Sequence, residues 1–119
     1  MKTKHSLVEN FKFAFAGIGV AVSMGRNIKI MIGIGLLAIL TGLLLNIGGS
    51  GWLDLILIIS LVLSLEMLNT ALEAIVDLVS PDYNQKAKIA KDMAAGSVLL
   101  ASIASVFVGI AIFLPKILH

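Results

Sequence analysis

The segment from residue 66 to residue 77 carries side chains that can bind cations or exchange protons. It reads EMLNTALEAIVD and holds three of the seven acidic residues of the chain. On a helix, at about 100° per residue, its polar side chains share one stripe about 80° wide: Glu66, Asn69, Glu73 and Asp77. A hydrogen-bond ladder between helices explains Asn69 alone. Glu66 lies far enough inside its span that an ionised carboxylate costs about 3 kcal/mol there. Three carboxylates on one stripe need cations or protons to offset them, so the stripe predicts a cation-binding or proton-handling site.

A second cluster, KAKIAKDMAAGS at 86–97, contains Lys91 and Asp92. By itself, this pair is explained as a lysine at the membrane interface followed by an aspartate at a helix N-terminus, where a negative charge is favoured. Together with the acidic stripe, they suit a magnesium-bound polyphosphate, because carboxylate oxygens bind the metal while lysine and backbone N–H groups bind phosphates. No phosphate-binding loop of the type GxxxxGK[ST] is present. These residues alone therefore predict a cation-dependent site, and phosphoryl transfer does not follow from their spacing.

The composition indicates the elements that position these residues. Of 119 residues, 59% are hydrophobic and 13% are charged, which predicts a single all-α membrane domain over 1–119. Three segments are long enough to cross about 30 Å of hydrocarbon: 28–47, 52–79 and 91–114. We expect Gly48–Gly51 to form the first turn, Trp52 to open the second span, Ser80-Pro81 to end it, and Pro115 to end the third. The residues 6–24 predict an amphipathic helix on the membrane surface, or else a packing helix on the same side.

Basic residues near the span ends predict the orientation, since they favour the cytoplasmic side. Eight lie at the N-terminus or in the second loop, and one lies on the opposite side: Lys2, Lys4, Lys12, Arg26, Lys29, Lys86, Lys88 and Lys91, against Lys116. Small residues recur every fourth position in two rows: Gly17, Ala21 and Gly25, then Ser97, Ala101, Ser105 and Gly109. Such rows let helices pack closely, so we expect an oligomer, although membrane helices are often rich in glycine and alanine.

Two motifs of this sequence resemble the signature of the prokaryotic diacylglycerol kinase family, which includes the undecaprenol kinases of Gram-positive bacteria. The first is E-x-x-N-T-A-x-E-x-x-x-D at 66–77, and the second is A-K-D-M-A-A-G at 90–96. The similarity extends to Arg26-Asn27 before the first span, to Trp52, and to FLPK at 113–116. The ends of the chain look nearer to the undecaprenol kinases.

The resemblance implies an enzyme of the bacterial plasma membrane that phosphorylates a lipid alcohol, undecaprenol or diacylglycerol, with ATP and Mg²⁺ at the cytoplasmic face. It also implies a homotrimer with composite active sites between subunits. Glu66 matches the proposed general base, Asn69 a polar residue that arranges the site, and Glu73 a magnesium ligand. The positions that match nucleotide-binding residues are Lys91, Asp92, Asp82 and Asp77. No residue is assigned to the lipid, and these roles suit phosphoryl transfer, which depends on placement and metal charge.

One position departs from the family pattern. The family typically has a metal-binding glutamate directly before Arg-Asn, and this sequence has Gly25 there. Glu9, the nearest upstream acid, would lie about 24 Å away along a helix. Magnesium can be held by one carboxylate together with phosphates and water, so Glu73 can suffice.

Two alternatives stay open: a family member that binds nucleotide or lipid without catalysis, and a small proton- or cation-coupled transporter. A transporter needs an acid accessible from both faces, and beyond the stripe only Asp54 lies near the other end.

Overall fold

The computed structural model describes residues 6–119, apart from the side chain of Arg26. These residues form helices and no strand. The helices are α1 (Leu7–Met24), α2 (Arg26–Leu45), α3 (Gly49–Val79) and α4 (Gln85–Ile117). Each is long and apolar enough to cross a membrane, which confirms the predicted all-α membrane architecture. Lys2 and Lys4, which contribute to the predicted orientation, lie outside the described residues.

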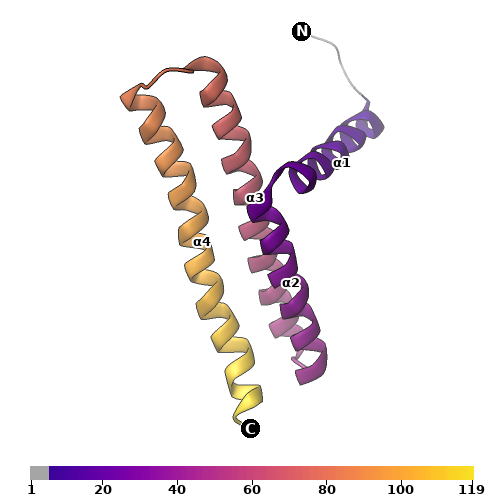
Figure 1. The fold of residues 1–119 in the computed structure, drawn as a ribbon. Coiled ribbons are helices and arrows are strands. Elements are labelled where there is room, and N and C mark those ends of the chain that lie inside the picture. Colours follow the sequence, from indigo (N-terminus) through magenta and orange to yellow (C-terminus); the bar gives the residue numbers. More distant parts are fainter. Residues whose placement is uncertain (1–5) are drawn as a thin grey trace.

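The two longest helices form a hairpin that carries the polar residues. α3 packs chiefly against α4, and α2 packs against the first half of α3 (Figure 1). At 1.5 Å per residue, the 31 residues of α3 span about 46 Å and the 20 residues of α2 about 30 Å. The hairpin therefore extends beyond the start of α2, and its loop lies at the projecting end (Figure 1).

The helix ends at this hairpin follow from capping. α3 ends at Val79, directly before Ser80-Pro81, as predicted. Asn84 caps α4, because its side-chain oxygen accepts hydrogen bonds from the backbone N–H of Lys86 and Ala87 at 2.9 and 3.2 Å. The helix thus begins at Gln85, well before the predicted span, which starts at 91.

The expected end of the last helix at Pro115 is wrong. α4 continues through Pro115 to Ile117, and Leu118 caps it. A proline in the last turn removes only one backbone hydrogen bond, and the rest of the turn still forms.

The turn between α2 and α3 lies earlier than predicted. α2 ends at Leu45, and its C-cap, Asn46, has the left-handed φ of 54° that asparagine tolerates better than most residues. The glycines at 49–51 then form the first turn of α3, before Trp52. A Cβ added to Gly42 would lie 3.0 Å from both Trp52 and Ile47, so this glycine lets α2 and α3 approach closely.

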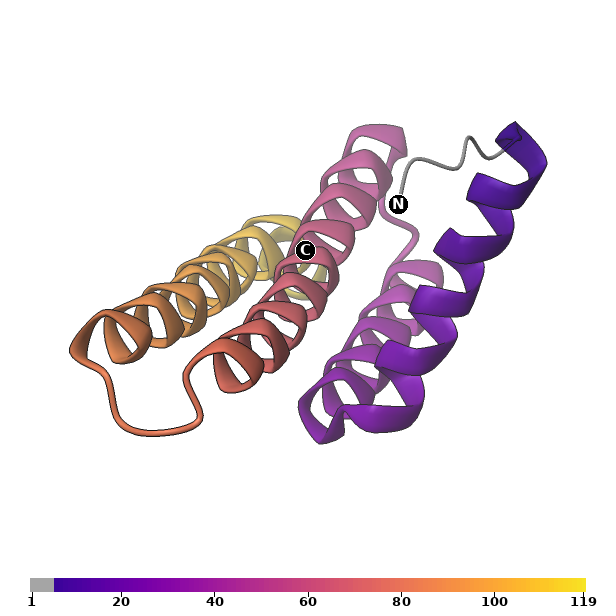
Figure 2. The ribbon, with the colours of Figure 1, turned by 90° about the horizontal axis from the view of Figure 1, so that it is seen from above.

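Helix α1 forms over the predicted residues but packs little against the rest of the chain. Ser6 caps it, accepting a hydrogen bond from the Glu9 backbone N–H at 3.2 Å. The helix leans away from the other three, and none of the residues Leu7–Met24 is buried (Figures 1 and 2). The most apolar 18-residue stretch of α1 is less apolar than that of each other helix, although α1 too could cross a membrane. Its position on the membrane surface stays a prediction.

Candidate functional site

The polar stripe of α3 runs from the buried part of the helix to its exposed end. Glu66 and Asn69 are 4% and 9% exposed, and they are the buried polar side chains of residues 6–119. Glu73 and Asp77, one and two turns further along the helix, are exposed. The stripe predicted from the spacing therefore forms, with its deepest carboxylate at Glu66.

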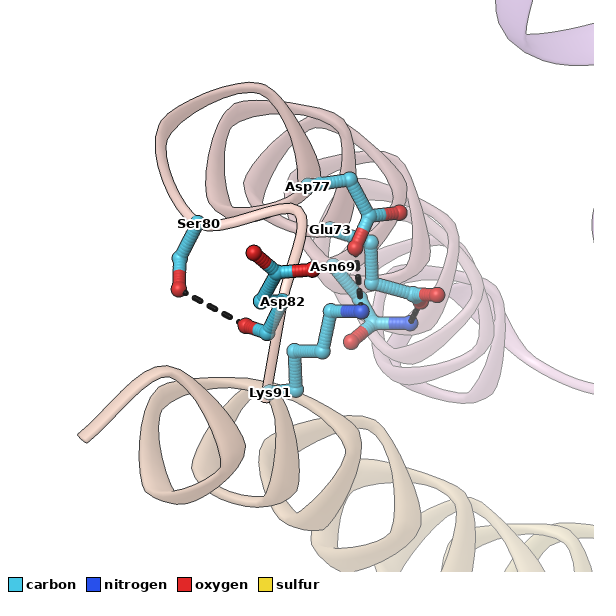
Figure 3. A network of polar contacts seen from close by, with 6 residues as sticks. All are labelled: Asn69, Glu73, Asp77, Ser80, Asp82 and Lys91. Carbon is cyan, nitrogen blue, oxygen red and sulfur yellow. Dashed lines mark hydrogen bonds and ion pairs between the residues drawn. The ribbon is translucent and has the colours of Figure 1, made fainter. Parts of the chain in front are cut away.

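Asn69 links the buried and exposed parts of the stripe. Its Nδ2 donates a hydrogen bond to Glu73 Oε1 at 2.7 Å (Figure 3). Within the described part of the chain, no donor reaches Glu66 Oε2 or Asn69 Oδ1, although both atoms are buried. Buried acceptors are normally satisfied, so these two oxygens point to a proton donor or a cation that the isolated chain does not supply.

An ion pair joins the two helices of the hairpin at the loop end. Lys91 of α4 donates a hydrogen bond from Nζ to Oδ1 of Asp77 on α3 (Figure 3). In the loop, the Ser80 hydroxyl donates to the backbone carbonyl oxygen of Asp82 at 3.1 Å. Both contacts tie the end of α3 to the segment that follows it.

A pocket of about 360 Å³ lies at the loop. Its lining includes the four residues predicted to bind the nucleotide: Asp77, Asp82, Lys91 and Asp92. Asp92 accepts a hydrogen bond from Lys88 Nζ at 2.6 Å. The pocket thus combines two lysines with several carboxylates, next to the exposed end of the polar stripe.

The acidic side chains fit a magnesium ion only in part. Among residues 6–119, no three histidine, aspartate or glutamate side chains gather closely enough to hold a metal ion. Glu73 and the free oxygens of Glu66 and Asn69 are hard oxygen ligands of the kind that Mg²⁺ binds. Their chemistry suits an ion that takes most of its ligands from phosphates and water.

Sequence reasoning missed three residues of this region. The side chain of Asn27, at the start of α2, interacts with the Glu66 carboxylate. Tyr83, which is 81% exposed, and Lys88 line the pocket at the loop. The place of Lys88 in the 86–97 cluster and of Tyr83 beside Asp82 could have indicated that both line the pocket. The face that Asn27 presents to α3 could not be predicted, because it depends on how the helices pack.

The fold and this region define a class: an all-α membrane protein with a buried carboxylate on α3 and a charged pocket at the loop end of the α3–α4 hairpin. The family model of prokaryotic diacylglycerol kinase matches residues 12–113, and the chain belongs to that family.

Three relatives support this membership. A protein of Synechocystis sp. named diacylglycerol kinase is 45% identical over 95% of this chain and 65% of its own length. The undecaprenol kinase of Bacillus subtilis is 40% identical over 66% of this chain and 64% of its own length. The diacylglycerol kinase of Escherichia coli is 41% identical over 46% of this chain and 52% of its own length. The chain thus spans just under two thirds of the first two relatives.

Proposed function

We propose that this protein is a lipid kinase that transfers the γ-phosphate of ATP to the hydroxyl of a membrane lipid alcohol, undecaprenol or diacylglycerol. The observation that carries the proposal is the Glu66 carboxylate, which is 4% exposed and has an unpaired oxygen. A buried carboxylate with a free acceptor atom can take a proton from an alcohol. The names of the relatives supply the two lipid classes.

In this proposal, Glu66 accepts the proton of the lipid hydroxyl as its oxygen attacks the phosphate. Asn69 fixes Glu73 through its amide hydrogen bond and keeps its own oxygen free. Glu73 and the oxygen of Asn69 would hold the magnesium ion that accompanies ATP. Such an ion would supply positive charge that offsets the charge of the phosphates during transfer.

The pocket at the loop binds the nucleotide. The Lys91 ammonium neutralises phosphate charge, and Asp82 and Asp92 accept hydrogen bonds from nucleotide hydroxyl and amino groups. Asp77 belongs to the same pocket.

We further propose that α1 lies on the cytoplasmic surface of a bacterial plasma membrane, that the α3–α4 loop faces the cytoplasm, and that three copies form the active enzyme. Two observations support the assembly. Much of the apolar surface of residues 6–119 is exposed in the single chain, and its buried apolar core consists of a few residues: Ile28, Ile47, Leu55, Val98 and Ala101. Carboxylates or other oxygen ligands from a neighbouring copy would complete the partial metal site.

Transfer of radiolabelled phosphate from ATP to undecaprenol or diacylglycerol, in detergent with and without Mg²⁺, tests the proposal. We expect labelled lipid with one of the two alcohols, and none after the metal is removed by chelation. Glu66→Gln should lower the rate by about 10²–10⁴-fold, the usual contribution of a general base, without changing the size of the assembly. Asp54→Asn, which neutralises an exposed acid of the same helix, is the control and should keep full activity. The proposal fails if neither alcohol is labelled, and unchanged turnover in Glu66→Gln removes the role of base.

Gly25 favours one alternative, a family member that binds nucleotide or lipid without transferring phosphate. Saturable binding of a fluorescent ATP analogue, with no labelled lipid from either alcohol, would identify that case.

A further inference from the structure

The Asp77–Lys91 ion pair differs from the neighbouring pair of Lys88 and Asp92. Lys88 and Asp92 lie one turn apart on α4, and both are more than half exposed. Asp77 and Lys91 lie on different helices, and the Lys91 side chain is only 38% exposed. Figure 3 shows Lys91 reaching from α4 to Asp77 at the end of α3, on the face of α3 that also carries Asn69 and Glu73. The pair therefore directs the ammonium toward the polar stripe.

The chemistry of the pair assigns different roles to its two members. An ammonium has three donors, so one bond to Asp77 leaves two for phosphate oxygens. The Asp77 carboxylate carries the same sign of charge as a phosphate, and Lys91 already occupies one of its oxygens. Asp77 is thus poorly suited to bind the polyphosphate and well suited to restrain a long side chain that otherwise has many rotamers.

Building on the proposed function, we propose that Asp77 is a positioning residue: from α3 it holds the Lys91 ammonium of α4 at the loop end of the polar stripe, in the pocket where the phosphates of the nucleotide are bound. Asp77 then acts on the nucleotide only through Lys91. This assignment replaces direct nucleotide binding by Asp77, which the resemblance implied.

A double-mutant cycle tests the assignment, because residues that act through one another have coupled effects. The variants are Asp77→Asn, Lys91→Met and the double variant, and the KM for ATP and the KM for the lipid are measured for each. Asp77→Asn should raise the KM for ATP about three- to fivefold, the size of a partly exposed ion pair. Lys91→Met should raise it about 10- to 100-fold, since a charged hydrogen bond to phosphate is lost. The double variant should match Lys91→Met within about twofold.

Two further measurements separate positioning from a general structural role. The KM for the lipid and the thermal unfolding midpoint should stay the same in Asp77→Asn, and Asp77→Glu, which keeps the charge, should recover most of the affinity for ATP. Asp54→Asn is the matched control for the loss of one carboxylate from α3.

The possible results are distinct. Multiplied effects in the double variant would show that Asp77 contacts the nucleotide directly. A lower KM for ATP in Asp77→Asn would show that Asp77 competes with the phosphates for Lys91. Either result overturns the positioning role while leaving the kinase intact, whereas a wild-type protein that labels no lipid overturns the proposed function itself.

Discussion

At the scale of single residues, the site depends on oxygen atoms whose partners lie outside the chain. Glu66 Oε2 and Asn69 Oδ1 are buried, and no described residue donates to them. In the proposed enzyme, the lipid hydroxyl donates to Glu66, and Asn69 would offer its oxygen to the metal. The unpaired atoms are thus the ones that the substrates complete, which is typical of sites that sacrifice local stability for function.

The family pattern suggests a metal-binding glutamate at position 25. The structure shows that any side chain at this position also meets a steric constraint. Gly25 forms the junction of α1 and α2, and an added Cβ would lie 2.8 Å from Cγ2 of Ile28, a buried residue. A substitution at position 25 therefore shifts Ile28, in addition to any effect of the new side chain on metal binding. The steric effect and the effect of a carboxylate need separate variants.

We predict that Gly25→Glu lowers the Mg²⁺ concentration required for half-maximal transfer about tenfold relative to Gly25→Ala, the gain of about 1.4 kcal/mol from one more ligand. Gly25→Ala introduces the same contact with Ile28 without a carboxylate, so the comparison isolates the ligand. Titration of activity with Mg²⁺, and of binding with Mn²⁺ by electron paramagnetic resonance, measures both variants. Equal metal requirements would place position 25 away from the metal in this protein.

At the scale of the elements, the α3–α4 hairpin carries the site. The contact of α2 with α3 supports the end of this hairpin that lies away from the loop. Gly42 and Trp52 meet at this contact. Gly33 lies on the same helix, and an added Cβ there would meet no described atom within 4 Å. The two glycines of α2 thus provide a matched pair.

Gly42→Val should destabilise the protein by about 1–3 kcal/mol relative to Gly33→Val, because an added side chain overfills a close-packed contact. Both variants replace glycine by the same β-branched residue in one helix, so differences in helix propensity cancel. The thermal unfolding midpoint in detergent measures the difference. Equal midpoints would mean that α2 and α3 do not depend on this close approach.

At the scale of the whole molecule, all four helices expose large apolar side chains in the described chain. Part of this surface faces lipid in a membrane protein, and part is available to neighbouring copies. The proposed orientation places the loop between α3 and α4, with its pocket, in the cytoplasm, where ATP is found.

The absence of cysteine from the sequence makes this orientation directly testable. Gln85 and Ser50 are exposed at opposite ends of the hairpin, at the starts of α4 and α3. In intact cells freed of their wall, a membrane-impermeant maleimide should label Ser50→Cys and leave Gln85→Cys unlabelled until the membrane is permeabilised. The reverse pattern would invert the proposed topology and separate the pocket from cytoplasmic ATP.

The sequence by itself determined the helical architecture and the polar stripe, because both depend on local periodicity. Apolar runs long enough to cross a membrane predicted three of the helices, and residue spacing put the side chains from Glu66 to Asp77 on one face of α3. Helix ends were less predictable: the Asn84 cap starts α4 at Gln85, and α4 continues past Pro115. Such ends depend on side-chain hydrogen bonds and on how much one lost backbone bond costs, which composition does not show.

Only the tertiary structure decided which polar groups meet. Packing of α2 on α3 brought Asn27 near Glu66, and the hairpin brought Lys91 to Asp77 across 14 residues of sequence. It also showed that Gly25 lies against Ile28. These contacts depend on the rotation and depth of each helix against its neighbours, and those follow from the summed packing of many side chains rather than from the spacing within any one helix.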